Sequence, residues 1–210
     1  MKKAIIGKKV GMTQVFLENG DCLPVTVILA GPCPVVSKKT VEKDGYSSAV
    51  LGFETTTEKK LNKAQLGQFK KANLQPMRTL KEFKLDNAEA LEVGTVLDVT
   101  QFASGDKVDV CGTTRGRGYT GVIQRWNQHR LKMTHGTGPV HREVGSMGAN
   151  SDPSRVMKLK HMPGRYGHER VTIQNLQVVK VDLDKNVLLV KGAVPGPKGS
   201  LVTVVNSVKG

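Results

Sequence analysis

Short apolar runs separated by turn signals dominate the first quarter of the chain. The runs cover residues 4–6, 13–16, 23–29, 35–37 and 48–53. Asn19-Gly20 stands between two of these runs and is a typical hairpin turn, and Asp44-Gly45 is a second turn signal. Many short strands joined by tight turns are typical of an antiparallel barrel or sandwich, which is the fold class that we expect for this region.

Residues 57–92 have a different pattern. Leu61, Ala64, Leu66 and Phe69 recur near helical spacing with Lys and Gln between them, and a second run covers 79–91. This pattern predicts a small, partly helical insert. Its lysines could contact phosphate, although a solvated helix face is the commoner meaning of such a pattern.

Strand patterns return after the insert and continue to the end of the chain. They cover residues 95–99, 107–111, 171–181, 187–190 and 201–205. The stretch 113–170, which we call the arm, therefore lies between strands of one β body, and its two ends should leave that body close together. We expect a body built from residues 1–56, 93–112 and 171–210, with an insert at 57–92.

The arm has an unusual composition. Its 58 residues contain eight of the nine arginines, all five histidines and the only tryptophan, with eleven Lys and Arg against three acids. Nine glycines interrupt it and aliphatic residues are few. Such a segment cannot bury enough apolar surface to fold by itself. We expect it to become ordered by lying against nucleic acid.

The whole chain is also basic. Its formal charge of +14 and pI near 9.8 favour a polyanionic partner. RNA is preferred over DNA because folded RNA offers irregular pockets that an extended segment can enter. Aromatic residues make up only 4%, which argues against a sheet that stacks bases. Three widely spaced cysteines predict free or buried thiols in a reducing compartment, and no apolar run is long enough to span a membrane.

Two patterns in the arm resemble enzyme motifs, but their sequence context disfavours both. The stretch 116–121 is a literal GxGxxG with Glu143 downstream, as in dinucleotide-binding sites. No apolar second strand leads into Glu143, however, and the chain lacks βαβ alternation. Ser146 and Ser151 have no carboxylate–histidine spacing that would indicate a nucleophile. We therefore expect no enzyme, cofactor or small-molecule substrate, and a basic DNA-compacting protein remains an alternative.

The histidines do not form a metal-binding pattern. None of them has a cysteine at ligand spacing or belongs to a helical pair with glutamate between. RNA contact or packing is expected of them instead, and no metal site is predicted. Trp126 has polar neighbours, and its sequence context leaves three roles open. The ring could stack on RNA, wedge at the root of the arm, or pack within the protein.

A set of glycine, arginine and histidine motifs is similar to the signature of the large-subunit ribosomal protein L-three family, bacterial type. The motif residues are Phe102, Asp109, Gly112, Thr114, Gly116-Arg117-Gly118, Gly121, Arg125, Trp126, His135-Gly136, Gly145-Ser146 and Met162-Pro163-Gly164, together with the opening Ile5–Thr13.

This resemblance implies both a fold and a function. The fold would be the six-stranded antiparallel β-barrel of translation proteins, with a helical insert and a long extended internal arm. The protein would bind 23S rRNA near its 3′ end in the large subunit of the cytoplasmic ribosome, beside other large-subunit proteins, and would help to nucleate assembly. The tip of the arm would approach the peptidyl transferase centre without catalytic groups. Ala149 replaces a glutamine that some members methylate, so that modification is not expected.

The candidate site residues all come from the arm. The predicted RNA contacts are Arg115, Arg117, Arg125, Trp126, Arg130, Lys132, His135, His141, Arg142, Arg155, Lys158, Lys160, His161, Arg165, His168 and Arg170. The predicted tip is small and flexible and consists of Gly145, Ser146, Met147, Gly148, Ala149 and Asn150.

Overall fold

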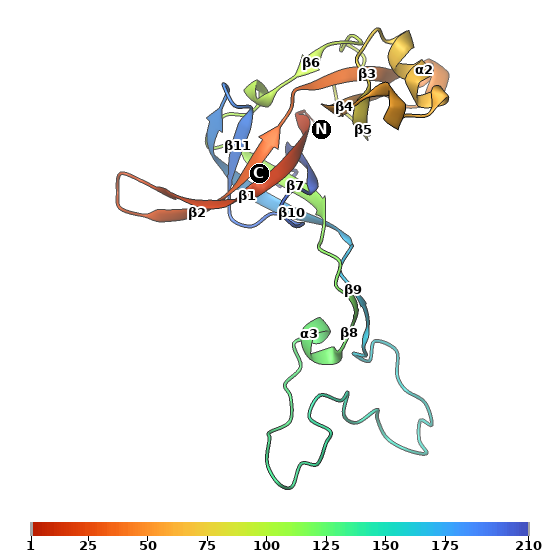
Figure 1. Cartoon of the computed structure of the whole chain (residues 1–210), viewed down its shortest axis with the longest axis vertical. Helices are drawn as coiled ribbons and strands as arrows, with labels where there is room; N and C mark the ends of the chain where they lie inside the picture. Colours follow the sequence, from red (N-terminus) through yellow and green to blue (C-terminus); the bar gives the residue numbers. More distant parts are fainter. Residues whose placement is uncertain (1, 210) are drawn as a thin grey trace. The chain divides into compact units, whose positions relative to one another are not determined.

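Residues 2–209, which the computed structural model describes, form a mainly β structure that divides into two units (Figure 1). The first unit, which we call the body, runs up to Thr114 and resumes at Arg170. The second, the arm unit, is Arg115–Glu169. In the described part of the chain no helix is both long enough and apolar enough to cross a membrane.

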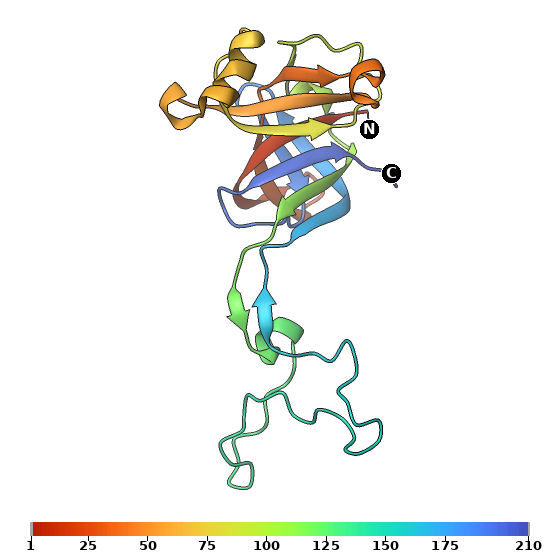
Figure 2. The same ribbon diagram turned by 90° about the vertical axis from the view of Figure 1, so that its right-hand side faces the viewer.

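Six antiparallel strands of the body close into a barrel (Figure 2). In spatial order they are β1 (Ala4–Phe16), β12 (Leu201–Asn206), β7 (Lys107–Thr113), β10 (Arg170–Asp182), β11 (Val187–Lys191) and β2 (Cys22–Ala30). The predicted six-stranded antiparallel barrel is thus confirmed. The predicted hairpin is confirmed as well, since β1 and β2 pair as far as Phe16 opposite Cys22.

The barrel interior is filled by apolar side chains that recur along the strands. In β11, Leu188 and Val190 are buried while their neighbours are not, as the two-residue period of a strand requires. The buried Asp109 of β7 has a structural role. Its carboxylate accepts hydrogen bonds from the backbone N–H of Asn175 (2.8 Å) and of Val208 (3.4 Å), and Asn175 lies where β10 shifts register against β7. Asp109 therefore stabilises the bulge in β10.

A second sheet packs with the barrel into one core. Its order is β5 (Met77–Phe83), β4 (Ser48–Thr55), β3 (Cys33–Lys39) and β6 (Val96–Leu97). The sequence predicts one β body that includes residues 1–56, but the strands within residues 33–55 belong to this second sheet and not to the barrel. Val35, Leu51 and Phe83 share one buried cluster with Ile28 and Leu188 of the barrel, so the two sheets have a common core.

The insert is partly helical, but its second run was predicted incorrectly. Helix α2 (Lys63–Lys71) matches the helical spacing and begins with a capping box formed by Asn62 and Gln65. The run 79–91, in contrast, begins within strand β5, in which Leu80 lies opposite Gly52, and residues 84–91 form neither helix nor strand. Pairing along an existing strand outweighs the weak helical periodicity there. The remaining short helices are α1 (Val41–Asp44), η1 (Glu58–Lys60) and η2 (Val99–Gln101).

All three cysteines are free thiols, as predicted. Cys22 is exposed, and Cys33 and Cys111 are buried. Burial raises the pKa of the Cys33 thiol to about 12, so it stays protonated at neutral pH.

Candidate nucleic-acid interface

The chain enters and leaves the arm through paired backbone. In the body, Thr113 of β7 lies opposite Arg170 of β10, so the two ends of the arm are adjacent, as predicted. In the arm unit, β8 (Gly118–Thr120) pairs antiparallel with β9 (Gly164–Tyr166). The Arg117 N–H donates to the Tyr166 carbonyl oxygen (2.9 Å), which extends the ribbon by one residue.

Glycine permits the close backbone approach in this ribbon. Gly167 has φ +75°, and a Cβ there would collide with the Arg115 carbonyl oxygen. The GxGxxG stretch lies in the same ribbon, where Gly118 begins β8 and Gly121 precedes helix α3 (Val122–Trp126). An antiparallel partner strand and a five-residue helix do not provide the parallel βαβ setting of a dinucleotide site.

Four residues join the end of α3 to the returning chain, and we call them the clasp: Arg125, Trp126, His161 and Met162. The Trp126 and His161 rings stack with centroids 4.1 Å apart and planes 4° from parallel. Trp126 Nε1 and Arg125 Nη1 both donate to the Met162 carbonyl oxygen, each at 2.9 Å. Among the alternatives for Trp126, the structure favours packing within the arm, with 39% of the residue still exposed.

Beyond the clasp the chain is irregular. No helix or strand occurs between Asn127 and Pro163, and within the arm unit only Thr120 and Val122 are buried. A few hydrogen bonds shape this stretch, such as the one from the Leu131 N–H to the His141 carbonyl oxygen (3.1 Å). The arm unit therefore has no apolar core of its own.

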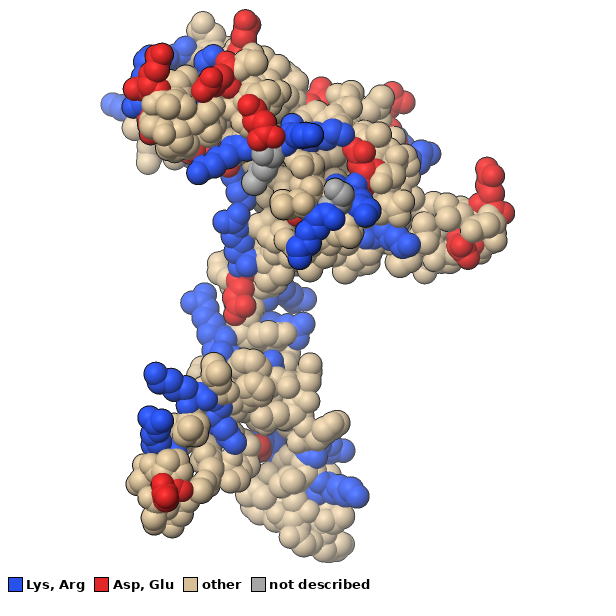
Figure 3. Space-filling model, turned by 180° about the vertical axis from the view of Figure 1, so that it is seen from behind, with Lys and Arg blue, Asp and Glu red and all other residues tan. Residues whose placement is uncertain are grey.

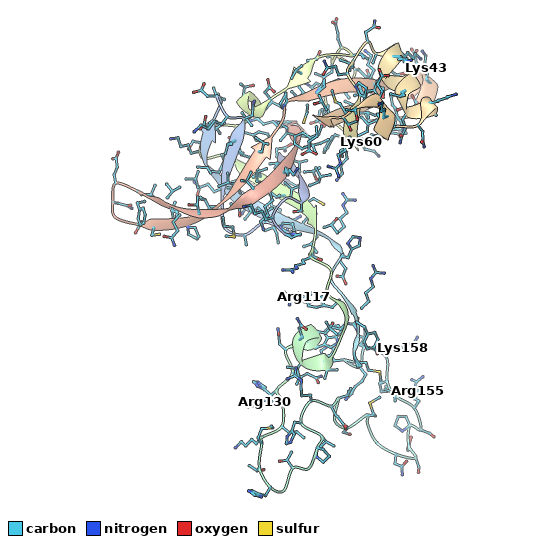
Figure 4. The ribbon with its side chains drawn as sticks, viewed as in Figure 1. Lys43, Lys60, Arg117, Arg130, Arg155 and Lys158 are labelled. Carbon is cyan, nitrogen blue, oxygen red and sulfur yellow. The ribbon has the colours of Figure 1, made fainter. Side chains whose placement is uncertain are left out.

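The cationic side chains of the arm unit lie on its surface. Figure 3 shows Lys and Arg gathered over this unit, and Figure 4 shows that Arg130 and Arg155 come from different branches of the irregular chain. The exposed cations are Arg115, Arg117, Arg130, Lys132, Arg142, Arg155, Lys158, Lys160 and Arg165. Arg125 differs from them because it is half-buried in the clasp.

Arg170 has a protein partner. It belongs to the body, at the start of β10, and its Nε donates to Cys111 Sγ (3.1 Å). Burial acts to raise the pKa of the Cys111 thiol, but hydrogen bonds with Arg170 and Thr172, together with the charges of Arg170 and Lys81, outweigh it, so the pKa lies below its ordinary value. Arg170 thus contributes to the barrel where the arm begins.

The five histidines are dispersed. His161 is in the clasp, His168 lies beside Gly116 with φ +57°, and His141 helps to line a shallow cavity of about 430 Å³ with Arg130 and Arg142. His129 and His135 are exposed. Over residues 2–209, no three His, Cys, Asp or Glu side chains are grouped so that they could hold a metal ion.

The predicted tip is exposed and carries a tether that the sequence did not reveal. Gly145 and Gly148 have φ of +78° and +135°, conformations that favour glycine. Lys160 Nζ donates to the Ser146 carbonyl oxygen (2.7 Å), so a residue fourteen positions away holds the tip turn. Spacing in the sequence gives no signal for such a contact, because neither branch has a regular period.

Sequence reasoning also missed two tyrosines of the ribbon. Tyr119 is 78% exposed and lies opposite Arg165. The Arg117 guanidinium lies over the Tyr166 ring, 5.5 Å from its centroid. Paired residues share one face of a ribbon, so Tyr119 and Arg165 together present an aromatic and a cationic group. In β8 the exposed Tyr119 precedes the buried Thr120, and this change of side along the strand could have indicated the surface formed by Tyr119 and Arg165.

The family model for ribosomal protein L3 matches residues 56–187, which is more than half of the chain. The chain belongs to the ribosomal protein L3 family. The match includes the insert, the whole arm, and β7 and β10 on either side of it. Proteins of this family are structural constituents of the large ribosomal subunit, associated with rRNA and other ribosomal proteins, and are not of an enzymatic kind. The resemblance found in the sequence is thus confirmed.

Loss of the clasp should loosen the arm without affecting the body. Trp126→Ala removes a ring stack worth about 0.5–1.5 kcal/mol and one hydrogen bond. We expect faster limited proteolysis around the clasp itself, at residues 121–126 and 161–164, and an unchanged melting temperature of the body. Trp126→Phe keeps a ring that can stack, so its cleavage rate should lie between those of Trp126→Ala and the parent. Leu159→Ala, at an exposed neighbouring position, serves as the control. Equal cleavage rates for Trp126→Ala and the parent would contradict the role of the clasp.

Proposed function

We propose that this L3-family protein binds 23S rRNA near its 3′ end, helps to nucleate large-subunit assembly, and places the tip of its arm near the peptidyl transferase centre. The rRNA region, the role in assembly and the location of the tip come from the family resemblance. The observation that carries the role of the arm is its lack of a core. A 55-residue unit with two buried residues and a cationic surface is well suited to take its final path from a folded polyanion.

The electrostatics support the same proposal. Each Arg or Lys that neutralises a phosphate releases condensed counterions, which favours binding at moderate salt. The proposed contacts are the exposed cations of the arm unit with Arg125, Arg170, Trp126 and the histidines His135, His141, His161 and His168. Planar guanidinium groups can bind phosphate in a bidentate manner or stack on bases, so the excess of arginine suits irregular RNA. Tyr119 adds an exposed ring for base stacking.

The rRNA specificity can be tested with the full-length chain. It should bind a 3′-terminal fragment of 23S rRNA at least about tenfold, or 1.4 kcal/mol, more tightly than a 5′ fragment of equal length at the same salt concentration. Filter binding at several salt concentrations measures both the affinity and the salt slope. Equal affinity for the two fragments and for random duplex DNA would contradict the proposal and would favour a DNA-compacting protein.

The location of the tip predicts a drug phenotype. Substitutions at Ser146–Asn150, with Gly148→Val as the most severe, should change the sensitivity of cells to inhibitors of the peptidyl transferase centre severalfold. Gly138→Val is the matched control because Gly138 also has a positive φ (+65°) and lies outside the tip. Inhibitory concentrations that stay constant for substitutions at all five positions from Ser146 to Asn150 would exclude the proposed location.

A further inference from the structure

The outer half of the β1–β2 hairpin lies outside the barrel. β1 last pairs with β12 at Lys8, and β2 first pairs with β11 at Val25. Between these points, residues 10–24 form a two-stranded ribbon that projects from the body in Figure 1. None of these fifteen residues is buried. We call this segment the outer ribbon.

The outer ribbon carries no Lys or Arg. About one residue in seven of the chain is Lys or Arg, yet none occurs between Lys9 and Lys38. The end of the ribbon instead carries Glu18 and Asp21, and Figure 3 shows acidic side chains at that end. A surface with two carboxylates and no cation would be repelled by RNA phosphates. The outer ribbon is therefore poorly suited to contact rRNA.

One face of the outer ribbon is apolar and exposed. Phe16 is 74% exposed and lies opposite Cys22, and Met12 on the same face is 52% exposed. Pro24, opposite Gln14, lies between them on this face. An exposed apolar patch rimmed by polar groups is typical of a protein–protein interaction site. Burying Phe16 alone would contribute roughly 1.5–3 kcal/mol, which gives a partner a strong anchor point.

Hydrogen bonds order the end of the outer ribbon. The Leu17 N–H donates to the Asp21 carbonyl oxygen (2.9 Å), and the Gly20 N–H donates to the Leu17 carbonyl oxygen (3.0 Å). Asn19 Nδ2 donates to Asp21 Oδ2 (2.7 Å), which fixes one of the two carboxylates. A preformed turn loses little conformational entropy when it binds.

We propose that the outer ribbon docks onto a basic protein neighbour in the large subunit. An apolar pocket of that neighbour receives Phe16 and Met12, and Lys or Arg around the pocket meets Glu18 and Asp21. The partner is identified by charge complementarity, because the ribbon offers carboxylates beside an apolar anchor. The inference rests on the place of the chain in the large subunit, and it does not depend on the path of the arm.

A photocrosslinker at position 16 tests the docking directly. Phe16→p-benzoylphenylalanine keeps an aromatic ring at an exposed position, so the full-length chain should fold and enter large subunits. Irradiation of purified large subunits, followed by mass spectrometry, should yield one major crosslinked protein with an isoelectric point above about 9. Products mainly with rRNA or with a second copy of this chain would overturn the proposal, as would the absence of any protein product.

Charge reversal tests whether the carboxylates contribute. Combining the crosslinker with Glu18→Lys and Asp21→Lys should lower the yield of that product roughly tenfold, equivalent to the loss of about 1.4 kcal/mol. Asp184→Lys, at the exposed turn between β10 and β11, is the matched control and should leave the yield unchanged. An undiminished yield in the double reversal would overturn the charge argument. In parallel particles, a crosslinker in place of Arg130 measures whether the arm contacts rRNA. A failure of the proposed function of the arm can therefore be distinguished from a failure of the docking proposal.

Discussion

Replacing residues 121–163 with Asn-Gly is expected to leave the body folded and to remove most of the affinity for rRNA. Thr120 and Gly164 already lie opposite each other at the end of the β8–β9 ribbon. Asn-Gly is the favoured two-residue turn for such a pair, so the shortened chain can close a regular hairpin. The variant separates the body from the irregular part of the arm with little disturbance to either strand.

The body should keep its stability because its core lies elsewhere. The large buried cluster draws every member from residues outside the arm unit, including Ile6, Val110, Leu188 and Val204. Circular dichroism and thermal melting of the variant should therefore match those of the full-length chain within a few degrees. Global unfolding would show that the arm contributes to the core, contrary to the structure.

RNA affinity should fall because seven of the cations in the arm are removed. They are Arg125, Arg130, Lys132, Arg142, Arg155, Lys158 and Lys160. If each meets one phosphate of irregular RNA, the slope of log K against log salt becomes shallower by about 0.7 per contact, or roughly 5 in all. Filter binding at several salt concentrations measures this difference, and large subunits should mature poorly in cells that carry only this variant.

A full-length variant distinguishes the effect of the lost charge on RNA affinity from the effect of the shorter chain. Changing the same seven residues to Gln keeps the chain length and a polar side chain at each position but removes the charge. Its salt slope should match that of the shortened chain. Retention of the parent slope in either variant would place the phosphate contacts in the body, which includes the insert, or in the β8–β9 ribbon.

The barrel could be predicted because its strands carry local signals. Alternation, as at Leu188 and Val190, and turn residues, as at Asn19-Gly20, mark strands and hairpins without knowledge of their partners. The lack of a core in the arm was predictable from composition, since a stretch rich in Arg and Gly with few aliphatic residues cannot form one. Both features depend on residues near each other in the sequence.

The features that could not be predicted from the sequence are contacts between residues far apart in the chain. The sequence predicts a helix where strand β5 forms, because the pairing of β5 with β4, in which Leu80 lies opposite Gly52, leaves no signal in the periodicity of β5 itself. The stack of Trp126 on His161 joins residues 35 positions apart, and the tether from Lys160 reaches Ser146. No local pattern specifies such contacts in an irregular segment. They emerge only when the returning chain is placed beside the outgoing one.

In the free protein, amide hydrogen exchange should be slow in the barrel strands and fast in the part of the arm beyond the clasp. Amides that pair the barrel strands open only with global unfolding, so they should exchange at least about a thousandfold more slowly than unstructured peptide. Amides between residues 127 and 163 mostly lack a backbone partner and a core, so they should exchange close to the unstructured rate. The few with partners, such as Leu131, should show slight protection.

Exchange of the same amides in free protein and in assembled large subunits tests most directly whether rRNA orders the arm. We predict that residues 127–163 exchange rapidly in the free chain and become protected in the subunit, while the barrel strands are protected in both. Strong protection of 127–163 in the free protein would contradict this account, because the arm would then hold its conformation without RNA.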